Sequence, residues 1–81
     1  MQINVKLFAA ARQYCGREDV TVELGEVATV RDLRATLASD YPALVEILPA
    51  SMIAINHDYA TDDRNINAGV EVALIPPVSG G

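Results

Sequence analysis

Two short segments of strictly alternating residues constrain the fold of this chain more than any other feature. Residues 2–7 read Gln-Ile-Asn-Val-Lys-Leu, and residues 20–24 read Val-Thr-Val-Glu-Leu. Because successive side chains of a strand point to opposite faces, this period of two predicts two strands with one buried and one solvated face. The buried face then needs a covering layer.

One amphipathic helix is predicted to supply that layer. Thr29 is a favourable N-cap, and Asp32 follows three positions later, near the positive end of the helix dipole. Apolar residues then recur with helical spacing as far as Tyr41. Since Pro42 disfavours helical geometry at the residue before it, we expect the helix to end near Tyr41.

Two shorter helical segments are also expected. Residues 9–13 can form a helical turn, with Gly16 positioned to end it. Residues 43–48 are largely apolar and predict a second short helix, closed by Pro49. Both lie between predicted strands.

The second half of the chain predicts further strands. Residues 52–56 and 70–75 are expected to be strands, and the turn-forming residues 56–58 should begin a hairpin. Residues 62–65 are expected to be loop. One main helix against a small sheet is an α+β architecture.

Strand parity places large apolar side chains on the solvated face. Phe8, the only phenylalanine, falls on the same face as Lys6, and Ile75 falls on the same face as Glu71. Tyr59, on a loop or an edge strand, can extend this surface. We interpret Phe8, Tyr59 and Ile75 as a docking patch. The alternative is that a strand end twists and buries these residues.

The charge pattern limits the classes of partner. The net charge is −5, and the six lysine and arginine residues are scattered. Nucleic acid is therefore not expected as a partner, since phosphate binding needs clustered positive charge. An acidic surface suits a partner with a basic docking face. Arg31 and Arg34 are interpreted as part of the solvated face of the helix.

The sequence also points to a compartment. Cys15 is the only cysteine, which excludes an internal disulfide and fits a reducing environment. The N-terminal residues read as a strand and lack the features of a signal peptide. No apolar run approaches the length of a membrane span. We expect a cytoplasmic protein that makes no use of a membrane.

Candidate catalytic and metal-binding residues are few. Cys15 and His57 can in principle act as nucleophile and base, but a half-buried structural cysteine and a turn histidine are the better interpretation. His57 and the carboxylates Asp58, Asp62 and Asp63 match no calcium or zinc spacing, so no metal site is predicted. No glycine-rich loop joins a strand to a helix, so no phosphate site is expected.

The chain ends in Pro76-Pro77-Val78-Ser79-Gly80-Gly81. The last two residues have no side chains, so a narrow channel in another protein can enclose their backbone closely. Two prolines stiffen the preceding segment. We expect a folded domain over residues 1–75 and a flexible tail over residues 76–81, with the chemistry at the Gly81 carboxylate. The alternative is a merely frayed terminus.

Three stretches resemble the ubiquitin-like sulfur-carrier family, and within it the small subunits of molybdopterin synthase. They are residues 6–12 with Gly16, Lys-Leu-Phe-Ala-Ala-Ala-Arg; residues 52–56, Met-Ile-Ala-Ile-Asn; and residues 70–81, the last strand and tail. The similarity covers the whole chain. It departs from the family at Ile75, where an aromatic residue is common, and at residues 67–70, which replace a more acidic turn.

The resemblance implies a β-grasp fold and a carrier that is no enzyme on its own. An ATP-consuming, ubiquitin-activating-like adenylyltransferase would join the Gly81 carboxylate to AMP. A sulfur donor, either a sulfurtransferase or a cysteine desulfurase, would then form a thiocarboxylate. The large synthase subunit would receive the tail in a heterotetramer and use the sulfur to build the molybdopterin dithiolene from a cyclic pyranopterin.

The resemblance also implies roles for particular residues. Pro76, Pro77, Val78, Ser79 and Gly80 would be recognised as the tail. Phe8 and Ile75 would contact the partner, and no cofactor would be bound by this chain. Tyr59 is expected at the same interface because it extends their patch. Three other functions stay open: sulfur delivery to another thiolation pathway, a ubiquitin-like modifier attached to lysines, and a plain interaction module.

Overall fold

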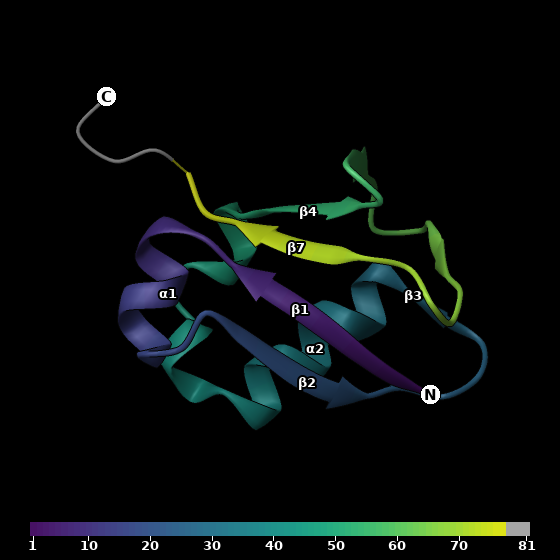
Figure 1. Cartoon of the computed structure of the whole chain (residues 1–81), viewed down its shortest axis with the longest axis horizontal. Coiled ribbons are helices and arrows are strands. Elements are labelled where there is room, and N and C mark those ends of the chain that lie inside the picture. The colour runs from purple at the N-terminus through teal and green to yellow at the C-terminus, as the bar shows by residue number, and fades with distance from the viewer. Residues whose placement is uncertain (78–81) are drawn as a thin grey trace.

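The fold is built around a five-stranded mixed sheet in the computed structural model, which describes residues 1–77 (Figure 1). The strand order across this sheet is β2-β1-β7-β4-β5. Its strands are β1 (Gln2–Leu7), β2 (Asp19–Glu23), β4 (Met52–Ile55), β5 (Asp58–Ala60) and β7 (Val72–Ile75). The main helix is α2 (Val30–Asp40), and a shorter helix, α1 (Ala9–Cys15), follows β1. These elements confirm the predicted α+β class.

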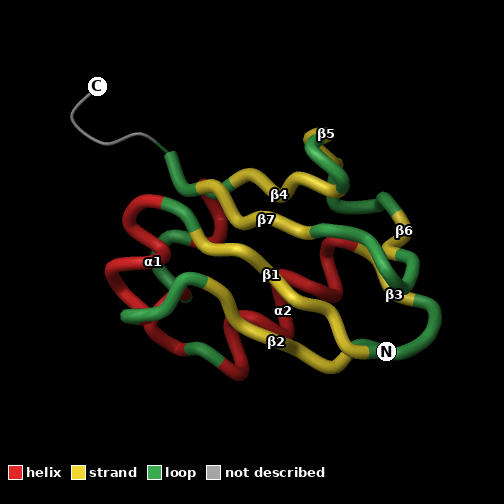
Figure 2. The backbone as a smooth tube through the Cα atoms, viewed as in Figure 1, coloured by secondary structure: helices red, strands yellow, loops and turns green. Residues whose placement is uncertain are grey.

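The neighbouring strands β1 and β7 are parallel, and every other neighbouring pair in the sheet is antiparallel. One face of the sheet is covered by α2, which crosses behind the strands (Figure 2). The C-terminal strand therefore lies in the middle of the sheet, next to the N-terminal strand. This placement brings residues from both ends of the sequence onto one surface.

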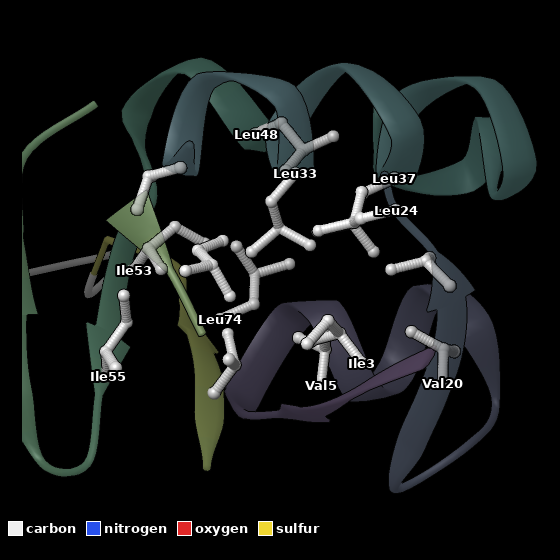
Figure 3. Packing of buried hydrophobic residues seen from close by; sticks show 14 of the residues in the cluster. Ile3, Val5, Val20, Leu24, Leu33, Leu37, Leu48, Ile53, Ile55 and Leu74 are labelled. Carbon is white, nitrogen blue, oxygen red and sulfur yellow. The ribbon is translucent and has the colours of Figure 1, made fainter. Parts of the chain in front are cut away.

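The core lies between the sheet and α2. The alternating residues of β1 are buried and exposed in turn, and β2 shows the same alternation, as predicted. Figure 3 shows Leu33 and Leu37 of α2 packed above Ile3, Val5 and Leu74 of the sheet. Removing such side chains from water is the main stabilising contribution to a domain of this size.

Local residues set the bounds of α2. The Thr29 hydroxyl accepts a hydrogen bond from the Asp32 backbone N–H, and the Asp32 carboxylate accepts one from the Thr29 backbone N–H. This reciprocal capping box satisfies two donors at the start of the helix. The helix ends at Asp40, directly before Tyr41, as the following proline predicts.

Residues with positive φ shape two of the turns. Gly16 has φ 67° and ends α1, as predicted, and its N–H donates to the Arg12 carbonyl. Asn56 and His57 have φ 50° and 73°, the combination required by a two-residue hairpin turn that matches strand twist. The predicted hairpin from β4 into Tyr59 is thus confirmed.

Three predicted elements differ from the structure. Residues 43–48 do not form one helix; two 3₁₀ turns, η1 (Pro42–Leu44) and η2 (Leu48–Ala50), lie there instead. A proline stands at the first or second position of each turn, where the backbone N–H has no partner within the turn. The predicted loop at 62–65 is confirmed for residues 62–64, but Asn65 already begins β6 (Asn65–Ile66), which pairs with β3 (Ala28–Thr29). The last strand begins at Val72 rather than at residue 70.

Arg34 is not part of a solvated face, contrary to the prediction. Its Nε donates to the Asp62 carboxylate at 2.9 Å, and its two terminal nitrogens donate to the carbonyls of Leu48 and Ser51 at 2.6 and 2.8 Å. Only 20% of the Arg34 side chain is exposed. The guanidinium fork therefore joins α2 to the turn before β4 and to the loop after β5. Arg31 is exposed, as predicted.

Candidate docking site beside the last strand

The uncovered face of the sheet carries a row of side chains that crosses four strands. The strand register pairs Lys6 with Ala73, Ala73 with Ala54, and Ala54 with Tyr59. Neighbouring strands lie about 4.8 Å apart, so Lys6 and Tyr59 stand roughly 14 Å from each other. Two alanines between longer side chains leave a depression along β7 and β4.

This depression is a hollow of about 340 Å³, which we name the open-face groove. Ala54 and Ala73 form its floor, Lys6 and Phe8 line its β1 side, and Tyr59 lines its β5 side. Its lining residues are Lys6, Phe8, Ala54, His57, Tyr59, Glu71, Ala73 and Ile75. Both apolar and charged groups therefore border one hollow.

Phe8 is held at the groove by the end of β1. Its backbone N–H donates to the Leu74 carbonyl, which continues the parallel pairing of β1 and β7. Ala9 then adopts φ 50°, a left-handed conformation that ends the strand and begins α1. With 40% of its surface exposed, Phe8 stays on the open face instead of entering the core.

Two ends of the groove differ in character. Ile75 lies at one end, opposite Met52, and Pro76 follows it. At the other end the Asn56 side chain accepts from the Glu71 backbone N–H, and the Asn56 N–H donates to the Glu71 carbonyl. The His57 Nε2 lies 3.5 Å from a Glu71 carboxylate oxygen. One end is thus apolar, and the other is polar and anchored.

The structure brings the three predicted patch residues together. Phe8 directly follows β1, Tyr59 lies on β5 and Ile75 lies on β7, and all three line the open-face groove. Tyr59 lies on an edge strand with 67% of its surface exposed, and Ile75 is half-buried. Their role in docking stays a prediction.

The predicted tail lies only partly within the described residues. Pro76 is buried against the domain and Pro77 is exposed. The predicted sites Val78, Ser79, Gly80 and Gly81 lie outside the described residues. The chain thus leaves the domain from the apolar end of the open-face groove.

Sequence reasoning missed the floor of the groove and the position of Lys6 beside it. The alanines carry no chemical signal of their own, and Ala54 appears in the sequence within an apolar run. Only the pairing of β4 with β7 shows that both alanines lie next to each other. A prediction of the strand order, with β7 in the centre of the sheet, would have revealed that these two alanines are neighbours.

The other candidate residues, Cys15 and His57, lie at the end of a helix and in a turn. Cys15 is half-buried at the end of α1, and His57 is a turn residue at the groove rim with 86% of its side chain exposed. Within residues 1–77, no three histidine, cysteine or acidic side chains are placed to hold a metal ion. The helices of this same part are too short or too polar to cross a bilayer.

Cys15 is expected to react slowly with thiol reagents. Burial raises the pKa of its thiol, and Arg17 only partly opposes this effect. Since the thiolate is the nucleophile, alkylation by iodoacetamide at pH 7–8 should be slower than for an exposed cysteine in a peptide. The pH at which the alkylation rate reaches half of its maximum should also be higher than for the exposed cysteine. Mass spectrometry of a timed reaction measures both, with urea-unfolded protein as the control; equal rates would contradict the prediction.

A mixed five-stranded sheet that grips one main helix, with the last strand central and leading into the C-terminus, defines the ubiquitin-like β-grasp class. Within this class, a family model described as ThiS family matches residues 5–81, and the chain belongs to that family. It is 40% identical to the molybdopterin synthase sulfur carrier subunit of Chlamydomonas reinhardtii, over 100% of both chains.

Solved structures share the fold over the full length. SAMP1 from Haloferax volcanii superposes with a TM-score of 0.88 at 31% identity, covering 100% of both chains. A chain in the complex of subunits 1 and 2 of molybdopterin-converting factor from Helicobacter pylori superposes with a TM-score of 0.70. That chain is 24% identical and is also covered completely, and the likeness concerns the fold.

Proposed function

We propose that this chain is the sulfur carrier subunit of a molybdopterin synthase, active in molybdenum cofactor biosynthesis. The observation that carries the proposal is the similarity over the whole length to relatives with that name, at 32–40% identity. The sequence also carries Gly80-Gly81, two residues after the Pro76-Pro77 pair. A reducing compartment, which we take to be the cytoplasm, fits the single cysteine.

In this proposal the reacting group is the carboxylate of Gly81. A carboxylate is a poor acyl donor, so an adenylyltransferase first joins it to AMP from ATP, with release of pyrophosphate. The persulfide of a sulfur donor, a sulfurtransferase or a cysteine desulfurase, then displaces AMP to form an acyl disulfide. A second thiol reduces this to the thiocarboxylate, with formation of a disulfide. The sulfur of the thiocarboxylate is transferred to a pyranopterin precursor. Glycine at both final positions lets the enzymes enclose the reacting carbon.

The chain itself supplies the carrier and not the catalytic pocket. The large synthase subunit is proposed to provide that pocket and to assemble with this chain as a heterotetramer. The complex of subunits 1 and 2 from Helicobacter pylori supports a partnership of this kind. Residues 76–80 would lie in the partner's channel, and Phe8, Tyr59 and Ile75 would contact its surface. No cofactor is bound by this chain in the proposal.

A second function is supported by a different observation. SAMP1 carries the name small archaeal modifier protein 1, and its structure matches this chain along its full length. A modifier would use the same adenylated Gly81 to acylate lysines of target proteins. A lysine-linked adduct of Gly81 on cellular proteins would identify this function, whereas a carrier alone would leave no such adduct.

The intact mass of the protein tests the proposed function directly. The chain is incubated with its adenylyltransferase, ATP and a sulfur source, and a reaction without ATP serves as the control. Replacement of one oxygen by sulfur at Gly81 is the expected result. Molybdopterin formation after addition of the large subunit and the pyranopterin precursor then tests the pathway. An unchanged mass, with an enzyme shown to be active, would refute the sulfur carrier.

Tyr59→Ala is expected to weaken binding to the large subunit about tenfold, because an exposed aromatic wall of the groove is lost. Tyr14→Ala is a matched control, since Tyr14 on α1 is also exposed, at 54%, but does not line the open-face groove. Calorimetry measures both affinities. Equal affinities for the two variants would contradict a role of the groove in docking.

A further inference from the structure

We propose that Met52 is a further docking contact for the large synthase subunit, and that oxidation of its thioether by a peroxide weakens this docking. The inference rests on the proposed function. Met52 begins β4 and is not among the residues that line the open-face groove. It lies opposite Ile75, beside the point where the chain passes from the last strand into Pro76.

Three apolar side chains form a row across the sheet at this point. The register pairs Met52 of β4 with Ile75 of β7, and the end of β7 lies beside the start of β4 (Figure 1). On the other side of β7, the parallel register with β1 continues to Phe8, whose N–H donates to the Leu74 carbonyl. Neighbouring strands lie about 4.8 Å apart, so the row is about 10 Å wide. We name Phe8, Ile75 and Met52 the tail-exit row.

The Met52 side chain lies on the open face of the sheet. Ile53 and Ile55 of the same strand are buried in the core cluster, so Met52 points the other way, because successive side chains of a strand alternate. Met52 is 46% exposed, much as Phe8 is at 40%. The core does not use this large apolar side chain. Contiguous apolar groups that stay exposed are typical of an interaction surface.

The position of the row identifies its occupant. Residues 76–81 can span at most about 20 Å, so a protein that encloses Gly81 must approach within that distance of Ile75. In the proposed function the large subunit does so and contacts Phe8 and Ile75. Met52 lies only about 4.8 Å beyond Ile75, on the next strand. An apolar part of the large subunit's docking face is therefore expected to cover Met52 too, and a flexible thioether adapts well to such a surface.

The same side chain is the more accessible target for oxidation. Hydrogen peroxide transfers one oxygen to the Met52 Sδ: the sulfur–oxygen bond forms, the oxygen–oxygen bond breaks, and water leaves. The sulfur is oxidised and the peroxide is reduced. The resulting sulfoxide is polar, and burying it against an apolar surface is unfavourable. The other methionine of the chain is Met1, and only 9% of its side chain is exposed. Met52 should therefore react first.

The first experiment measures binding of the unmodified chain to the purified large subunit of the same organism by calorimetry. Met52→Gln keeps the side-chain length but adds polar atoms, and it is expected to weaken the affinity about 5- to 20-fold. Val45→Gln is the matched control, because Val45 is also 46% exposed but follows η1, which packs against α2 behind the sheet. Its affinity should change less than about twofold.

Met52→Leu separates oxidation from packing, since it keeps an apolar side chain that peroxide does not oxidise. Untreated, it should bind within about threefold of the wild type. After treatment with hydrogen peroxide, the wild type should bind about 5- to 20-fold more weakly, and Met52→Leu should keep its affinity. Methionine sulfoxide reductase should restore the wild type. Cys15 is present in both chains, so its oxidation affects them equally.

A second readout is protection of the sulfur. Peptide mass spectrometry should show Met52 oxidised at least about fivefold more slowly in the complex than in the free chain, since docking covers its thioether. Thermal unfolding of each variant establishes that it is folded. An equal loss of affinity in peroxide-treated Met52→Leu would overturn the role of oxidation.

Two failures can be told apart. Equal affinities for Met52→Gln and Val45→Gln, or equal oxidation rates of Met52 in the free chain and the complex, would overturn the contact while leaving the proposed function intact. No binding by the wild type would refute the partnership and this inference with it.

Discussion

Deletion of Gly81 is expected to abolish sulfur loading while the domain stays folded. The new terminal carboxylate, on Gly80, would lie up to about 3.5 Å short of the reacting position in the activating enzyme. A misplacement of about 1 Å can reduce a rate 100-fold, so a loss of at least about 1,000-fold is expected. Intact mass after incubation with the adenylyltransferase, ATP and sulfur source measures the thiocarboxylate directly.

Two controls separate chemistry from folding in this experiment. Thermal unfolding of the shortened chain should match the wild type, because the buried core lies within residues 3–74. Gly81→Ala keeps the length of the tail but adds a methyl group where the enzymes enclose the backbone, so it should be loaded more slowly than the wild type. Loading of the shortened chain at the wild-type rate would show that the reacting group is not at Gly81.

Arg34→Met is expected to lower the free energy of unfolding by about 2–4 kcal/mol. The substitution keeps an apolar stem but removes three donors, two of which bond to the carbonyls of Leu48 and Ser51. Ser51 is 2% exposed, so little water is available to replace the guanidinium. For a domain of this size the melting temperature should fall by roughly 10–25 °C, as measured by calorimetry or circular dichroism.

Asp62→Asn provides the matched comparison for Arg34. The Asp62 side chain is 46% exposed, and an amide oxygen can still accept from the Arg34 Nε. The free energy of unfolding should therefore fall by less than about 1 kcal/mol, as for other partly exposed ion pairs. If Arg34→Met were as mild as Asp62→Asn, the two carbonyl bonds would contribute little. The Arg34 guanidinium would then stabilise the fold no more than an ion pair on the protein surface does.

Some features of the fold and the site follow from local sequence alone. The alternation in residues 2–7 and 20–24, the Thr29–Asp32 cap, and the turn at Asn56 each depend on neighbours a few residues apart. Strand parity also placed Phe8 and Ile75 on the open face, because side-chain direction alternates strictly along a strand. These interactions are short in range, so a single sequence is enough to predict them.

Arg34 shows why other features escaped prediction. On a helix pattern it occupies the polar face, and nothing near it in sequence reveals that the turns at Leu48 and Ser51 and the loop at Asp62 pack around it. Its partners lie 14 to 28 positions away in the chain. The need of buried carbonyls for donors, and not helix periodicity, decides where this side chain lies.

By itself, the sequence determined the strands, the capped helix and the Pro-Pro-Val-Ser-Gly-Gly ending, since these depend on residue type and local spacing. The tertiary structure decided that β7 lies between β1 and β4. That strand order places Ala73 beside Ala54, with Lys6 and Tyr59 on either side, and so creates the open-face groove. Pairing between strands far apart in the chain is set by burial of the whole core, and no local pattern encodes it.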